Sequence, residues 1–284
     1  MDLLQADPLI LLWLSLLGLG VGFLTGMFGI GGAFITTPVM ITFFGVEPSV
    51  AVGCSMGFTL VNGCLGLKRH SGAGNAEPWA MWPIAIAASS GTVIGFLFHN
   101  QLKVALGENF DSIVNLMFCA ILIPIGLLVW WQSDKDQGKP WLSKFHVPVM
   151  KKLNQKDLPP ISITLLVAMG LAIGVVKGML GIGGGIILVP ALVLLVGLVP
   201  HRAVTVALGT VVLSSLVGAI LYALAGNLNF GIVGAMLLGS LLGVILGAKF
   251  CNVASPKTLK RWLAILILFF SVFLGWQAYV DLAM

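Results

Sequence analysis

Charged side chains are scarce in this sequence. Asp, Glu, Lys and Arg make up 9% of the 284 residues, whereas soluble proteins carry about a quarter. So few charges cannot cover the surface of a soluble protein of this length, and hydrophobic residues supply 58% of the chain. The composition therefore predicts an integral membrane protein that turns an apolar surface toward lipid.

Cysteine is also rare, and its four positions lie far apart in the chain. No CxxC pair occurs, so the sequence predicts neither a zinc site nor a disulfide framework, and no metal or cofactor is expected. The net charge of +5 does not indicate nucleic-acid binding, because the basic residues lie in short loops between apolar runs. Membrane proteins use Lys and Arg in such loops to fix their orientation.

Apolar runs of about the length of a membrane helix, roughly 17 to 25 residues, follow one another along the chain. The first is not preceded by a basic residue, so we expect it to be retained rather than cleaved as a signal peptide. Two runs, 33–44 and 186–199, are too short for a straight crossing, and each follows a glycine cluster. Each is expected to be a tilted short span or the return arm of a re-entrant hairpin. The other runs cover residues 9–27, 50–67, 79–98, 113–131, 161–180, 203–225, 230–250 and 262–280.

The two halves of the chain are related by an internal duplication. A shift of 152 residues aligns 26–100 with 178–252 without a gap, and GMFGIGG at 26–32 falls on GMLGIGG at 178–184. Chance similarity between apolar stretches would not hold Gly, Pro and Asn in register. The matched pairs include Pro38 with Pro190, Gly45 with Gly197, Pro48 with Pro200, Gly91 with Gly243, and Gly95 with Gly247.

The distribution of basic residues predicts the topology. If every run crosses, or if each short run returns to its own side, each half makes an odd net number of crossings and the halves are inverted. With the N-terminus outside, 13 of the 15 basic residues then lie in cytoplasmic loops. We therefore expect an all-α integral membrane protein of two inverted five-segment repeats, 1–131 and 161–284, with about 8 to 10 transmembrane helices. Residues 132–160 form the cytoplasmic linker, and both termini are extracytoplasmic.

The glycine clusters predict the site. Broken helices at matching positions of two repeats are typical of secondary transporters, in which freed backbone amides point toward a substrate. We expect the two clusters to meet near the midplane with their amides facing an anion. The alternative is that these glycines only allow close helix packing. The clusters are Gly29, Gly31 and Gly32 in the first half and Gly181, Gly183, Gly184 and Gly185 in the second.

Lys177 is the basic residue that lies inside an apolar run, and its repeat equivalent is Thr25. No Asp or Glu is near it in the sequence, so a substrate anion is an attractive partner for its charge. The alternative is a lysine that extends along the helix to the outer interface. Polar residues within the third and eighth runs are further candidates for anion binding, or else form interhelical hydrogen bonds. They are Ser55, Thr59, Asn62, Thr210 and Ser214.

The segments GMFGIGG before Pro38 and GMLGIGGG before Pro190, in a chain of two related halves, resemble the TauE/SafE family of sulfite and organosulfonate exporters. The resemblance covers nearly the whole chain outside the linker. It implies an inner-membrane permease for sulfite, sulfoacetate or related sulfur-containing anions. Only the matching glycines and prolines carry over from the family, and the role of Lys177 rests on the sequence itself.

The sequence is consistent with three functions. The first is a secondary transporter, an exporter of small anions by alternating access between the repeats. The second is an anion-selective channel built from the same residues. The third, an embedded enzyme, is disfavoured because the apolar runs contain no His-Glu metal motif, carboxylate pair or Ser-His-Asp set. The expected partners are a small anion and the lipid bilayer, and the sequence leaves homo-oligomerisation open.

Overall fold

The structure is a computed structural model that describes residues 8–71, 77–107, 110–132, 163–198, 200–253 and 256–283. These residues form helices joined by short connections, and they include no strand. From residue 133 on, the predicted linker lies outside the described residues. The first half contains α1 (Pro8–Phe28), α2 (Ala33–Phe44), α3 (Pro48–Ser71), α4 (Pro78–Leu106) and α5 (Phe110–Gln132). The second contains α6 (Ile163–Leu180), α7 (Gly185–Ala191), the π-helix η3 (Leu192–Val196), α8 (Pro200–Leu224), α9 (Phe230–Val253) and α10 (Pro256–Ala283).

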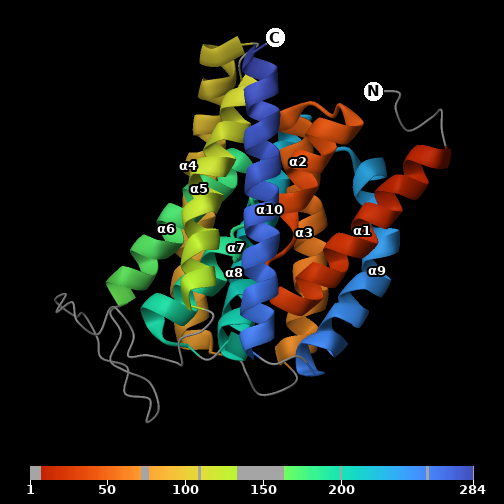
Figure 1. Ribbon diagram of the computed structural model, residues 1–284. Coiled ribbons are helices and arrows are strands. Elements are labelled where there is room, and N and C mark those ends of the chain that lie inside the picture. Colours follow the sequence, from red (N-terminus) through yellow and green to blue (C-terminus); the bar gives the residue numbers. More distant parts are fainter. Residues whose placement is uncertain are drawn as a thin grey trace.

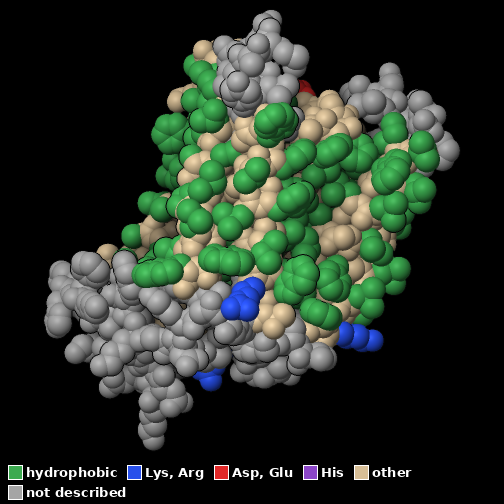
Figure 2. Space-filling model, viewed as in Figure 1, with side chains coloured by type: hydrophobic (Ala, Val, Ile, Leu, Met, Phe, Trp, Pro, Cys, Tyr) green, Lys and Arg blue, Asp and Glu red, His purple; other side chains and the backbone are tan. Residues whose placement is uncertain are grey.

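The helices form an apolar bundle with its charges at the ends. Six of them, α1, α3, α4, α6, α8 and α9, are long and apolar enough to cross a membrane. Large hydrophobic side chains cover the sides of the bundle, and Lys and Arg side chains gather at one end (Figure 2). We call this the basic end, and the opposite end, at which α1 begins and α10 finishes, the terminal end (Figure 1). The basic end carries Lys68, Arg69, Arg202, Lys249 and Arg261. The predicted all-α membrane fold is thus confirmed.

Helices of the first half pack mainly on helices of the second. α1 lies along α9, and α6 lies along α4. Because α6 corresponds to α1 and α4 to α9 in the sequence repeat, these two interfaces are equivalent. α3 packs on α8 and α5 packs on α10, so two more interfaces join equivalent helices. This pairing agrees with the duplication that the sequence predicts.

The first short helix is the return arm of a hairpin. The start of α1 and the end of α2 line one apolar groove, which includes Ile10 and Leu14 from α1 and Val39 and Phe43 from α2. α2 therefore comes back to the terminal end, from which α1 started. Of the two arrangements expected from the sequence, the structure has the re-entrant hairpin.

The second hairpin, formed by α6, α7 and η3, enters from the basic end and leaves by it. α6 runs parallel to α4, since Gly170 lies against Ile84 and Gly178 lies against Thr92. An ion pair joins the starts of α4 and α8 at the basic end, and α8 follows η3 after a short connection. The two hairpins therefore point toward each other from opposite ends, which agrees with the predicted inverted repeats.

Glycines make the turn at the tip of each hairpin. Gly29, Gly31 and Gly32 have φ angles of 68°, 75° and 79°, and the matching Gly181, Gly183 and Gly184 have φ angles of 73°, 83° and 72°. Residues with a side chain rarely adopt this left-handed conformation, whereas glycine does so freely. Three left-handed glycines within four residues are what allow the chain to reverse in so little space.

Other glycines bring the paired helices into backbone contact. A Cβ atom at Gly18 of α1 would lie 1.9 Å from the carbonyl oxygen of Met236 in α9. At the equivalent position of the other half, a Cβ at Gly170 would lie 2.6 Å from the carbonyl oxygen of Ile84. Without a hydrophobic driving force inside lipid, such close approach is what holds membrane helices together.

We predict that Gly18→Ala destabilises the protein, whereas Gly20→Ala on the same helix does not. Gly20 faces outward, and a Cβ there has no atom within 4 Å. Both substitutions gain about 1 kcal/mol of helix propensity, so the difference between them isolates the packing. Overpacking at Gly18 should cost about 1–3 kcal/mol, measured as a lower thermal unfolding midpoint in detergent. Equal midpoints for the two variants would contradict the tight seam between α1 and α9.

Candidate functional site

The two hairpin tips touch each other inside the bundle. A Cβ at Gly185 would lie 2.7 Å from the backbone carbon of Ile30, and a Cβ at Gly183 would lie 2.9 Å from the Cβ of Ala33. Ile30 and Ile182, which sit at matching places in the two tips, are both fully buried. The glycine clusters therefore meet, as the sequence predicts.

The contact lies near the middle of the bundle. A Cβ at Gly31 would lie 2.8 Å from Thr59 and 3.2 Å from Val211. Thr59 is about half-way along α3 and Val211 about half-way along α8. The core helices α3 and α8 thus form the walls around the place where the hairpins meet.

Side chains of the first half satisfy carbonyl groups of both tips. Thr59 donates to the carbonyl oxygen of Gly31 at 3.1 Å, and Thr37 donates to that of Gly181 at 3.1 Å. In the first hairpin the helical hydrogen bonds stop with the amide of Gly29 and resume with that of Ile35. The amides between them belong to neither helical ladder, which is the condition for binding an anion at a broken helix.

A cluster of buried hydroxyl groups lies beside the tips. Ser55 lies 2.9 Å from the hydroxyl of Thr36 and 2.8 Å from that of Thr37, whose single hydrogen is shared between Ser55 and the carbonyl oxygen of Gly181. All three side chains and Thr59 are fully buried. This hydroxyl cluster, Thr36, Thr37, Ser55 and Thr59, belongs to the first half alone, since the equivalent residues are Leu188, Val189, Ala207 and Val211.

Lys177 is the charged counterpart in the second half. Its side chain is 1% exposed, so it points into the bundle and not to the outer interface. Its ammonium group donates to the hydroxyl oxygens of Ser214 at 2.6 Å and Ser215 at 2.7 Å, and to the carbonyl oxygen of Val211 at 3.2 Å. All three partners are uncharged, so these contacts provide hydrogen bonds but no counter-charge.

The side chain of Lys177 also packs on its own hairpin tip. A Cβ at Gly184 would lie 3.3 Å from the Cδ of Lys177. In the first half, Thr25 occupies the matching place beside Gly32, but its hydroxyl donates to the carbonyl oxygen of Val21 in its own helix. The two tips therefore share one backbone geometry and differ in the side chain that faces it.

The other predicted residues lie further along α3 and α8. Asn62 accepts a hydrogen bond from Ser240 of α9 and so contributes to helix packing. This agrees with the alternative prediction that such residues form interhelical hydrogen bonds. Among the described residues, its side-chain nitrogen and the hydroxyl of Thr210 are buried without a partner. The backbone carbonyl of Thr210 accepts a hydrogen bond from Ser214 at 2.8 Å, which places it next to the lysine.

The carboxylates whose side chains the structure describes lie at the ends of the bundle rather than at the tips. Glu77 accepts a hydrogen bond from Arg202 at 2.7 Å and another from the indole of Trp79, at the basic end. Glu47 pairs with Lys103 at the terminal end. The structure describes both of these carboxylates in ion pairs, and neither of them contacts Lys177.

Sequence reasoning missed Thr36 and Thr37, which complete the hydroxyl cluster. The signal was present, because two hydroxyl residues stand directly before Pro38 in the return arm. The sequence predicts only a tilted short span or a hairpin arm for 33–44, and a helix whose first turns are buried on all sides gives no periodic pattern that singles out its polar face. Seven of its first eight residues are in fact buried, both threonines among them.

Comparisons with known proteins agree with this architecture. The family model described as "Sulfite exporter TauE/SafE" matches residues 14–274. The probable membrane transporter protein YjnA of Bacillus subtilis is 25% identical over 260 residues, which cover 89% of this chain and 95% of YjnA. A probable membrane transporter protein of Methanocaldococcus jannaschii is 26% identical, with 90% of this chain and 92% of the relative covered.

A third relative, the probable membrane transporter protein YunE of Bacillus subtilis, is 25% identical, with 90% of this chain and 93% of YunE covered. No solved structure matches the chain. The family model spans both hairpins, the helices around their tips and the predicted linker. The chain belongs to the sulfite exporter TauE/SafE family and is a membrane transporter.

Proposed function

We propose that the protein is a secondary transporter that exports small anions by alternating access at the place where the two hairpin tips meet. The first candidates for the substrate are sulfite and organosulfonates such as sulfoacetate. The observation that carries the proposal is Lys177, a buried lysine beside a hairpin tip whose protein partners are all uncharged. A substrate anion at the tips would supply the counter-charge that the protein does not.

An anion can accept a hydrogen bond from the ammonium group of Lys177 at little cost in free energy. Ser214 already donates its own hydroxyl hydrogen to the carbonyl oxygen of Thr210 at 2.8 Å. It therefore keeps a hydrogen bond when the ammonium group of Lys177 turns toward a ligand. A hydrogen bond from a charged donor to an oxyanion is stronger than one to a neutral hydroxyl, which favours the exchange.

The hydroxyl cluster suits an oxyanion on the other side of the tips. Sulfite and sulfonate groups present several acceptor oxygens, and hydroxyl groups can turn to donate to them. Thr36 and Ser55 share one hydrogen bond in which either oxygen can be the donor. The cluster can therefore redirect donors without leaving a buried oxygen unpartnered.

The close contact between the hairpin tips supports alternating access rather than a continuous pore. Ile30 and Ile182 are fully buried where the tips meet, and the ion pair between Glu77 and Arg202 joins α4 to α8 at the basic end. The positive-inside rule puts this end in the cytoplasm. A monovalent anion that leaves a negative-inside cell then gains about 2.3 kcal/mol per 100 mV, so the membrane potential can drive export.

We predict that a sulfur oxyanion selectively stabilises the purified protein. Sulfite, sulfoacetate, methanesulfonate, taurine, sulfate, chloride and acetate would each be added in detergent, and the thermal unfolding midpoint followed. A specific ligand at 100 times its dissociation constant adds about 2.7 kcal/mol of stability. A midpoint that no anion raises would contradict the anion site, and a binder would next be tested for potential-dependent flux in vesicles.

We also predict that Lys177→Met leaves the protein folded and weakens anion binding by about 10- to 100-fold, because hydrogen bonds to charged groups contribute about 1.5–3 kcal/mol. Replacing a buried charge by an apolar side chain of similar length is often neutral or stabilising. Lys249→Met, which removes an exposed cation at the basic end, is the matched control and should bind normally. Wild-type affinity in the Lys177 variant would exclude the lysine from the site.

A further inference from the structure

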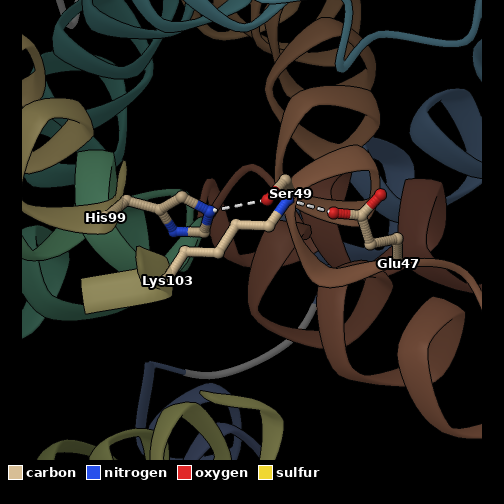
Figure 3. Close-up of polar contacts among 4 residues, drawn as sticks. All are labelled: Glu47, Ser49, His99 and Lys103. Atoms are coloured by element: carbon tan, nitrogen blue, oxygen red, sulfur yellow. Dashed lines mark hydrogen bonds and ion pairs between the residues drawn. The ribbon is translucent and has the colours of Figure 1, made fainter. Parts of the chain in front are cut away.

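A single histidine in α4 connects both hairpins at the terminal end. His99 is 1% exposed, although it lies only two turns from the end of its helix. Its Nδ1 is 2.7 Å from the carbonyl oxygen of Met179, and its Nε2 is 3.1 Å from the hydroxyl of Ser49 (Figure 3). Neither the carboxylate pairs nor the anion site described above uses this side chain.

The partners of His99 fix its tautomer. A carbonyl oxygen can only accept, so Nδ1 carries a hydrogen and donates to Met179. In the neutral ring Nε2 is therefore the acceptor, and the hydroxyl of Ser49 donates to it. The lone pair of Nε2 thus faces the hydroxyl of Ser49. This hydroxyl can change from hydrogen-bond donor to acceptor, since a hydroxyl oxygen accepts as well as it donates.

Each of the two hydrogen-bond partners of His99 lies next to one of the hairpins. Met179 lies in the last turn of α6, two residues before Gly181 in the second hairpin tip. Ser49 lies in the first turn of α3, directly after the connection that leaves the first hairpin. The imidazole therefore joins the tip of one hairpin to the exit of the other.

Solvent at the terminal end comes close to the ring. A cavity of about 330 Å³ is lined by Glu47, Pro48, Lys103 and Phe110, among others. The ring of Phe110 packs edge-on against His99 with 5.1 Å between centroids, and Lys103 lies one helical turn further along α4. The ion pair between Lys103 and Glu47, which both line this cavity, lies beside His99 and Ser49 (Figure 3).

Among the side chains that the structure describes, few other titratable groups lie around the ring. From α8 the ring of Tyr222 packs against His99, while its hydroxyl donates to the carbonyl oxygen of Gly178. α6 carries Lys177, whose ammonium group points to α8 instead. The connection between α2 and α3 carries Glu47, which offers a negative charge, and α4 itself carries Lys103, which offsets it. α5 presents the uncharged ring of Phe110.

We propose that His99 is a proton-binding site, reached from the terminal end, that is linked to the anion site. A proton from the aqueous cavity binds the Nε2 lone pair, so that a new N–H bond forms and the ring becomes an imidazolium. The hydroxyl of Ser49 then turns its hydrogen away and accepts from Nε2. The proton is the ligand and no other atom is transferred.

Protonation affects the second hairpin in two ways. The bond from Nδ1 to Met179 becomes charge-assisted and therefore stronger. The positive charge also lies beside Met179, which is two residues before the tip at which the proposed anion binds, so proton and anion favour each other's binding. The linkage half of this inference rests on the proposed anion transport, whereas the proton site itself does not.

Proton NMR of the imidazole tests the site directly. The chain has four histidines, so a variant in which His70, His146 and His201 are Gln reports His99 alone. We expect its ring signal to shift with pH between about pH 5 and pH 9, the range in which histidines titrate in proteins. A signal that stays constant over this range would overturn the proposal, whatever the outcome of the anion experiments.

The linkage is tested by anion affinity as a function of pH. The probe is methanesulfonate, which stays ionised throughout this range. Wild-type affinity should rise at least about fivefold from pH 8 to pH 5.5, the lower limit of typical coupling between sites, and His99→Gln should abolish this rise. Tyr222→Phe, which alters an equally buried neighbour but keeps the imidazole, is the control and should retain it.

A second variant tests the proposal if the His99→Gln protein does not fold. Ser49→Ala removes the partner of Nε2 but keeps the bond to Met179, so it should displace the midpoint of the NMR titration. An unchanged midpoint, or a pH dependence of affinity that survives in His99→Gln, would contradict the role of this histidine. If methanesulfonate does not bind at any pH, the linkage fails together with the anion site, while the NMR titration still decides the proton site.

Discussion

The structure depends on one constraint, which is that a backbone broken inside a membrane must find its hydrogen bonds within the protein. Unsatisfied amides and carbonyls in hydrocarbon cost several kcal/mol each. Groups from the other half or from the core helices supply these hydrogen bonds. Thr37 donates to the carbonyl oxygen of Gly181, and His99 donates to that of Met179. The second tip therefore depends on donors from the first half, and this need contributes to the extensive contacts between the halves.

The sequence was sufficient to predict the framework of the protein. Glycine and proline positions repeat so exactly that the duplication, the helix breaks and the meeting of the tips could all be expected before the structure. These residues are informative because few others can adopt a left-handed turn or interrupt a helix. The choice between a short span and a re-entrant hairpin needed three-dimensional contacts, since both place the same residues in the same order.

Side-chain partners were harder to predict than the backbone. The burial of Lys177 was one of two alternatives that the sequence left open, and its contact with Ser214 needed the structure. The role of Thr36 could not be predicted, because a helix that is buried on all sides shows no amphipathic pattern. The buried position of His99 could not be predicted either, because its distance from the end of the run says nothing about which way the ring points.

The difference between the two tips has a consequence for how the protein evolved. A symmetric ancestor made of two first halves would have had hydroxyl groups on both sides and no buried cation. One made of two second halves would have placed two lysines near each other, where like charges repel. The present chain holds a cation from one half and neutral donors from the other. Fusion of the halves into one polypeptide is what makes such a division of labour heritable, because it fixes one copy of each kind in every molecule.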